Sequence, residues 1–166
     1  MPAIKKLMDE VLSGPSTGDE FPGPLAEERK LVEQAKKLGL FAAGAATQKY
    51  MQAIQDQQEI MGAIADMTIE TYAMESAVLR AQKIVAGKGE SAAALPLAMT
   101  RVYLAQAMEK VESAARKVIS AVADGDMLRT QLAILRRLAK YEPFNSIALR
   151  HEIALKMIER GKYTLA

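Results

Sequence analysis

The stretch of residues 56–86 contains no proline and a single glycine, and it limits the folds open to this chain more than any other segment. Its inner-face residues recur at alternating steps of four and three, the period that places side chains on one face of an α-helix. They are Ile60, Ile64, Met67, Thr71, Met74, Val78, Ala81 and Val85. The spacing predicts one long helix, and its apolar face requires other helices to pack against.

The composition favours helices over strands along the whole chain. Its 166 residues, 50% of them hydrophobic, are enough for one substantial core and one globular domain. There is no tryptophan, and there are only three phenylalanines and five tyrosines. Alanine, methionine, leucine and long charged residues dominate, and these residues favour helix over strand. We therefore expect an all-α protein.

Further segments show helical spacing or helix-ending residues, and they are 25–50, 95–123, 127–139 and 146–160. Pro96 is compatible with the second of them only because it lies in the opening turn. Asp126 is the predicted N-cap of the third, and Asn145 or Ser146 that of the last. The last helix is predicted to bury Leu149, Ile153, Met157 and Ile158. Together these segments predict an antiparallel up-and-down bundle of four to five helices.

The chain divides near residue 24. Residues 13–24 hold three prolines and three glycines, too many for regular structure, and residues 3–12 before them could form a short amphipathic helix. We therefore expect residues 1–24 to be a short helix and linker from a preceding body, and residues 25–166 to be the bundle domain. Such an opening suggests a piece of a longer chain.

Two glycines interrupt the predicted helix 25–50. Gly39 and Gly44 should each cost about 1 kcal/mol relative to alanine inside a helix. Small residues surround them, so the first interpretation is close approach of a neighbouring helix. The alternative is that they merely loosen the helix.

Composition also excludes several classes of function. The absence of cysteine excludes disulfides, thiolate metal sites and a cysteine nucleophile, and it fits a reducing compartment, so we expect a cytoplasmic protein. The longest nearly uncharged run, residues 38–47, is about half of a membrane-spanning helix. A net charge of +2 is too small to favour nucleic acid as a partner.

No stretch of the sequence has the pattern of a reaction centre. His151 is the only histidine, and its charged neighbours favour a solvated position, while a ferritin-like di-metal site needs two histidines. Residues 87–91 have the wrong spacing for a phosphate loop and form a turn. The methionines could line a ligand groove, but at helical spacing they are better explained as core. The sequence thus predicts no catalytic, cofactor-binding or metal-binding residue.

One charged residue lies in a predicted inner face. Arg101 falls in the inward stripe of helix 95–123, where burial without a partner would be costly. A hairpin turning near residues 88–90 places position 101 opposite residues 77–79, within one turn of Glu75. We therefore predict a structural ion pair between Arg101 and Glu75.

Basic residues gather toward the C-terminus. Arg129, Arg136 and Lys140 share one face of helix 127–139, with Arg137 near it. Basic amphipathic helices bind anionic membrane surfaces or acidic protein partners. A solvated rim explains the same pattern equally well, so both interpretations stay open.

Three stretches carry a resemblance to a known family: AGAATQKY, QQEIMGAIADMTIETYAMESAVLRAQK and YEPFNSIALRHEIALKMIERGKY. They resemble the extra C-terminal domain of bacterial long-chain and very-long-chain acyl-CoA dehydrogenases, over nearly the whole chain from Leu25 onward. The leading residues 2–16 look like the segment that joins that domain to the catalytic body.

The resemblance implies an accessory role. In that family a flavin enzyme of fatty acid β-oxidation uses FAD and a catalytic glutamate, and the helical domain is appended to it. No residue here matches that glutamate or the glycine-rich flavin-contacting stretch, so the resemblance implies an inactive domain with no cofactor of its own. Its expected partners are the dehydrogenase body, a second copy in a homodimer, or an anionic membrane surface that would make it membrane-peripheral.

Overall fold

The computed structural model describes residues 23–162, and these residues form five α-helices and one 3-10 helix with no strand among them. The elements are α2 (Ala26–Tyr50), η1 (Met51–Asp56), α3 (Gln58–Ala92), α4 (Ala94–Val122), α5 (Gly125–Leu138) and α6 (Ser146–Arg160). The predicted helix 3–12 and most of the predicted linker lie outside the described residues. The all-α prediction is confirmed, and η1 is the element that the sequence did not predict.

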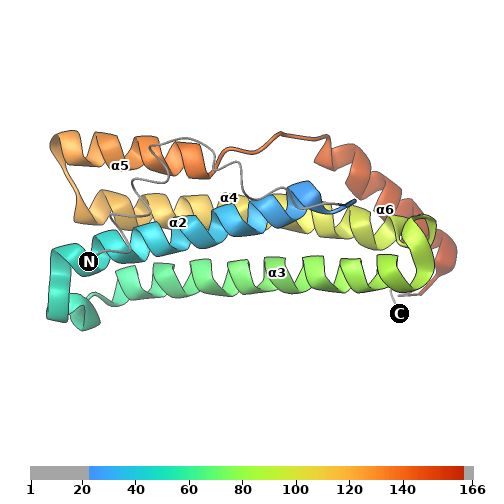
Figure 1. Ribbon diagram of the computed structural model, residues 1–166, viewed down its shortest axis with the longest axis horizontal. Coiled ribbons are helices and arrows are strands. Elements are labelled where there is room, and N and C mark those ends of the chain that lie inside the picture. The colour runs from blue at the N-terminus through green and yellow to red at the C-terminus, as the bar shows by residue number, and fades with distance from the viewer. Residues whose placement is uncertain (1–22, 163–166) are drawn as a thin grey trace.

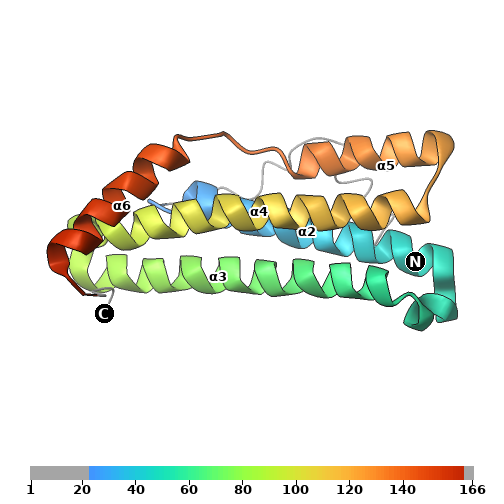
Figure 2. The same cartoon turned by 180° about the vertical axis from the view of Figure 1, so that it is seen from behind.

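Three long helices form the body of the domain. α2, α3 and α4 contact one another pairwise and run up, down and up along a common long axis (Figure 1). α5 contacts α2 and α4, whereas α6 contacts α4 and crosses its first turns at one end of the bundle (Figures 1 and 2). The fold is therefore a three-helix bundle with a short fourth helix along part of one side.

The core follows the predicted helical stripes. Most of the predicted inner faces of α2, α3 and α4 are buried or half-buried, and Phe41, Leu38, Met67, Met74, Leu104 and Met108 are among the largest side chains removed from water. Three methionines in that set are core residues, as the sequence indicated, whereas Met61, which was also expected in the core, is 42% exposed. Burying each such side chain stabilises the fold by about 1.5–3 kcal/mol, and this is what holds the helices together.

The helix ends agree with the sequence in part. The side chain of Asn145 accepts a hydrogen bond of 3.0 Å from the amide of Ala148, so the predicted cap of α6 is confirmed. Asp126 is not the N-cap of α5. The helix begins at Gly125, one residue before Asp126, so Asp126 lies in the first turn. There its carboxylate accepts a hydrogen bond from Arg129.

Two predictions about packing are corrected. A Cβ atom built on Gly39 meets nothing within 4 Å, so no neighbouring helix of the described chain approaches it closely, and the first interpretation is wrong there. Ile158 is 77% exposed instead of buried. The reason is that α6 contacts only α4 among the described elements, so the helix has one narrow inner face.

Candidate functional site

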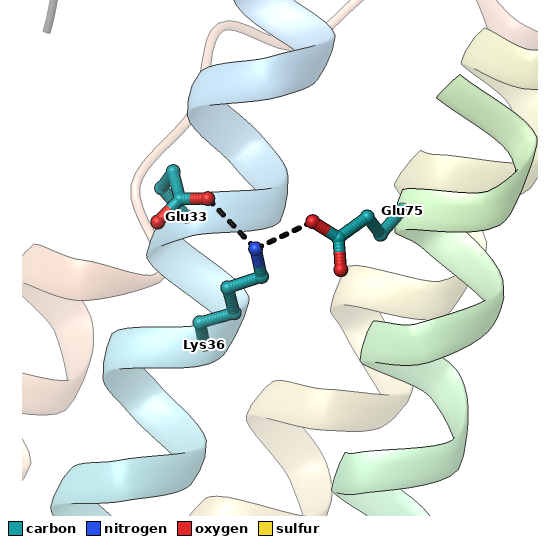
Figure 3. A network of polar contacts seen from close by, with 3 residues as sticks. All are labelled: Glu33, Lys36 and Glu75. Carbon is teal, nitrogen blue, oxygen red and sulfur yellow. Dashed lines mark hydrogen bonds and ion pairs between the residues drawn. The ribbon is translucent and has the colours of Figure 1, made fainter. Parts of the chain in front are cut away.

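The predicted pair of Arg101 and Glu75 is not formed, because each residue binds a different partner. Arg101 Nε donates to Glu28 Oε1 of α2 at 2.6 Å, while Glu75 Oε1 accepts from Lys36 Nζ at 2.7 Å. Lys36 also donates to Glu33 at 2.9 Å, so one ammonium group joins two carboxylates across α2 and α3 (Figure 3). Its hydrogen bond to Glu75, and then that to Glu33, raises the pKa of Lys36 above its usual value.

The hairpin register behind that prediction was nevertheless close. Placing position 101 opposite 77–79 puts Glu70 opposite about residue 109, and Glu70 accepts a hydrogen bond of 2.6 Å from Lys110. Tyr103 donates to the same carboxylate at 3.1 Å. Burial, and after it the charge of Glu70, raises the pKa of the Tyr103 hydroxyl. The prediction was wrong about where the Arg101 side chain points. That side chain is 49% exposed and reaches toward α2 instead of α3.

The predicted basic face lies on the outside of α5. Arg129, Arg136, Arg137 and Lys140 are all exposed, and the Arg129 guanidinium pairs with Asp126 at 3.0 Å. The backbone carbonyl of Lys140 accepts a hydrogen bond from Gln34, which ties the end of α5 to α2. Arg129, Arg136 and Arg137 are thus exposed on α5, and Lys140, also exposed, follows the end of that helix.

A second surface was missed by the sequence reasoning. Met61, Ala65, Ile69, Tyr72 and Leu79 are exposed at helical spacing on the side of α3 opposite the core, and we call them the α3 stripe. Tyr72 is 73% exposed and Ile69 63% exposed. A helix that is apolar on two faces normally packs on two sides. That second periodicity was present in the sequence and could have predicted the stripe.

A surface groove beside the stripe is lined by both α3 and α4. Its volume is about 790 Å³, and its lining residues include Gly62, Ala63 and Ile69 from α3 and Glu109, Ser113 and Ala114 from α4. A smaller groove of about 160 Å³ lies between α2 and α3. Within residues 23–162, no three His, Cys, Asp or Glu side chains are placed to share a metal ion.

The comparisons with known proteins assign this domain to a family. Residues 34–137 match the model of the acyl-CoA dehydrogenase C-terminal domain. The chain belongs to this family. It is 42% identical over 143 residues to a probable acyl-CoA dehydrogenase of Bacillus subtilis (strain 168), covering 86% of this chain and 24% of that protein.

A solved structure shares the fold. The chain is similar to an acyl-CoA dehydrogenase from Bacillus anthracis that was crystallised with FAD, with a TM-score of 0.91 and 39% identity. The match covers 98% of this chain and 27% of the other. This chain thus spans about a quarter of the length of both relatives.

Proposed function

We propose that this chain is the non-catalytic C-terminal domain of an FAD-dependent acyl-CoA dehydrogenase of fatty acid β-oxidation, of the long-chain or very-long-chain type. Its role is to support assembly of the enzyme by docking on the catalytic body. The α3 stripe is the observation that carries this proposal, because its apolar side chains are exposed in the described residues and exposing them to water is unfavourable.

The size of the stripe favours a tethered partner. From Met61 to Leu79 a helix extends about 27 Å, and a face about 10 Å wide then offers on the order of 270 Å². A stable complex of separate proteins buries about 800 Å² on each partner. A body joined to the domain through the same chain needs less area, because its effective concentration is high. The area of the stripe therefore fits docking on a dehydrogenase body of the same chain better than association of two separate copies in a homodimer.

The flavin is assigned to the parent enzyme and not to this domain. FAD carries a negatively charged pyrophosphate, and the larger groove has a negative excess, with Glu59, Asp66, Glu70 and Glu109 against Lys110 and Lys117. These residues do not fit that cofactor, because like charges repel at short range. We accordingly assign no catalytic or cofactor-binding role to any residue of this chain.

The test uses the full-length dehydrogenase that carries this domain. Ile69→Asp should release the domain from the body, which limited proteolysis between the two and small-angle scattering would both detect. Leu40→Asp is the matched control, since Leu40 is 65% exposed on α2 and lies away from the stripe. Equal attachment of the domain in the two variants would defeat the proposal.

An interaction module is the alternative, and the C-terminal helices favour it. The basic residues of α5 are exposed, and α6 adds the exposed apolar residues Ile147, Leu155 and Ile158. This combination is typical of helices that lie on anionic membrane surfaces. In residues 23–162, no helix combines the length and hydropathy that crossing a bilayer requires. The alternative predicts a cytoplasmic protein that associates with membranes peripherally.

Co-sedimentation of the chain with anionic vesicles at two salt concentrations tests that alternative. Binding should weaken at the higher salt concentration, because salt screens charge attraction between exposed groups. Replacing Arg136 and Arg137 by glutamate should abolish it. Binding that is unchanged in this variant would exclude the basic face of α5 as the contact.

A further inference from the structure

The groove between α3 and α4 is the larger of two grooves described above that α5 and α6 leave uncovered. α5 contacts α2 and α4, and neither α5 nor α6 contacts α3 in the described part of the chain. The groove is lined over about three turns of each of its two helices, from Glu59 to Glu70 on α3 and from Gln106 to Lys117 on α4. It adjoins the α3 stripe, because Ile69 belongs to both. The two features together form one continuous surface.

Gly62 lines this groove in the interior of α3. A glycine there costs about 1 kcal/mol relative to alanine. A Cβ atom at this position would meet nothing within 4 Å, so no packing inside the described chain requires the glycine. Its neighbours along the groove, Ala63, Ser113 and Ala114, are also small. The groove therefore admits close approach by an external element.

The charged residues that line the groove include more acidic than basic side chains. The lining carries the carboxylates of Glu59, Asp66, Glu70 and Glu109 against the ammonium groups of Lys110 and Lys117. Glu70 and Lys110 neutralise each other through their 2.6 Å ion pair. Glu59, Asp66 and Glu109 are exposed and face only Lys117 as a remaining basic residue of the lining, so they leave an excess of negative charge along the groove.

We propose that this groove receives a basic helix of the dehydrogenase body. This inference rests on the proposed function and names the chemistry of the docked segment. A groove between two antiparallel helices accepts the side-chain ridge of a third helix, and small lining residues let its backbone come near. The acidic lining selects basic side chains at the edges of that helix. The body is the occupant because the groove continues the α3 stripe, and because the matched relatives are about four times as long as this domain.

Single introduced cysteines provide the test, since the chain has no cysteine of its own. Gly62→Cys places a thiol in the groove, and Gly39→Cys is the matched control on α2, where a Cβ also meets nothing within 4 Å. Alkylation of each thiol is measured by peptide mass spectrometry, in this chain alone and in the full-length dehydrogenase. The thiol at position 62 should react at least about tenfold more slowly in the full-length enzyme, and the thiol at position 39 at nearly the same rate, because burial limits access.

A third variant separates this inference from the proposed function. Tyr72→Cys places the thiol on the α3 stripe, where docking on the body should also protect it. Protection at position 72 without protection at position 62 would overturn the groove inference and support the proposed function. Equal reactivity in the chain and in the enzyme at both positions would overturn both. Protection at both positions supports both.

The charge of the occupant is tested by reversal. Replacing Glu59 and Asp66 by lysine should remove the protection of the thiol at position 62, because like charges would then face each other. Replacing Glu27 and Glu142 by lysine is the control, as both are exposed outside the groove. Protection that survives the reversal at 59 and 66 would overturn the assignment of a basic helix.

Discussion

Arg101 Nε lies 2.6 Å from Glu28 Oε1, and this ion pair joins the first turn of α2 to the first half of α4. The two partners differ in environment, since the Glu28 side chain is 9% exposed and that of Arg101 49% exposed. The Glu28 carboxylate has little access to water and relies on the guanidinium to compensate its charge, whereas the Arg101 side chain is half-exposed to water. Losing the arginine leaves a nearly buried charge without its partner.

Arg101→Met should destabilise the domain by about 1–3 kcal/mol, the cost of leaving a buried polar group without its partner. Methionine keeps most of the apolar stem and so isolates the loss of the charge. Urea unfolding followed by circular dichroism measures the effect. Lys117→Met, at an exposed position of the same helix, should change the free energy of unfolding by less than about 0.5 kcal/mol. Similar values for the two variants would show that the ion pair contributes nothing.

The contact of Lys36 with Glu75 and Glu33 predicts a loss of stability at alkaline pH. The pKa of Lys36 is raised above 10.5 in the folded state, so the folded protein holds this proton more tightly than the unfolded chain. Its contribution is complete below pH 10.5 and is lost as the pH rises through the folded pKa. Unfolding by urea at neutral pH and at pH values above 10.5 should show this decline.

Lys36→Met should lower the free energy of unfolding by about 0.2–1 kcal/mol at neutral pH, as expected for a half-exposed ion pair. Its alkaline decline should be shallower than that of the unmodified chain, because one linked proton is gone. Lys30→Met, at an exposed position of the same helix, serves as the control. Identical alkaline slopes for the unmodified chain and Lys36→Met would contradict the assignment.

Periodicity predicted the helices and core well because both depend on local spacing. The buried residues Met67, Met74 and Val78 were all named from steps of three and four. The partner of Arg101 could not be found that way. Spacing within α3 and α4 sets the register of these two helices. Whether Arg101 reaches a carboxylate of α2 or of α3 depends on how the three helices are rotated about their own axes. That rotation is a property of the assembled bundle.

The surfaces show the same division between local and global information. The basic residues near the C-terminus were found because Arg129, Arg136 and Lys140 recur at the spacing that places side chains on one face of a helix. The groove between α3 and α4 was not found, because it is formed by side chains of two helices together. The sequence marks Gly62 as unusual, because it is the single glycine of the stretch 56–86. That it lines the groove is seen only in the structure.

Gln131 has the one buried side-chain atom, Oε1, that lacks a hydrogen-bond partner in the described residues. It lies on α5 near the buried Ile134 and Leu135, and the residue is 9% exposed. Gln131→Met keeps the length of the side chain and removes the unsatisfied oxygen. It should stabilise the domain by about 1–3 kcal/mol. Thermal and urea unfolding would show this, with the exposed Gln48→Met as the control, and a lower stability of Gln131→Met would contradict it.

Two glycines should respond oppositely to the same change. Gly39 lies inside α2 with open space around a built Cβ, so Gly39→Ala should stabilise the domain by about 0.5–1 kcal/mol through helix propensity and lost chain entropy. Gly161 ends α6 with φ +62°, and alanine there should destabilise by about 1 kcal/mol, because its Cβ disfavours the left-handed conformation. Urea unfolding of both variants compares the signs directly. Destabilisation by Gly39→Ala would instead support close approach of another element to α2, the interpretation that the described helices do not supply.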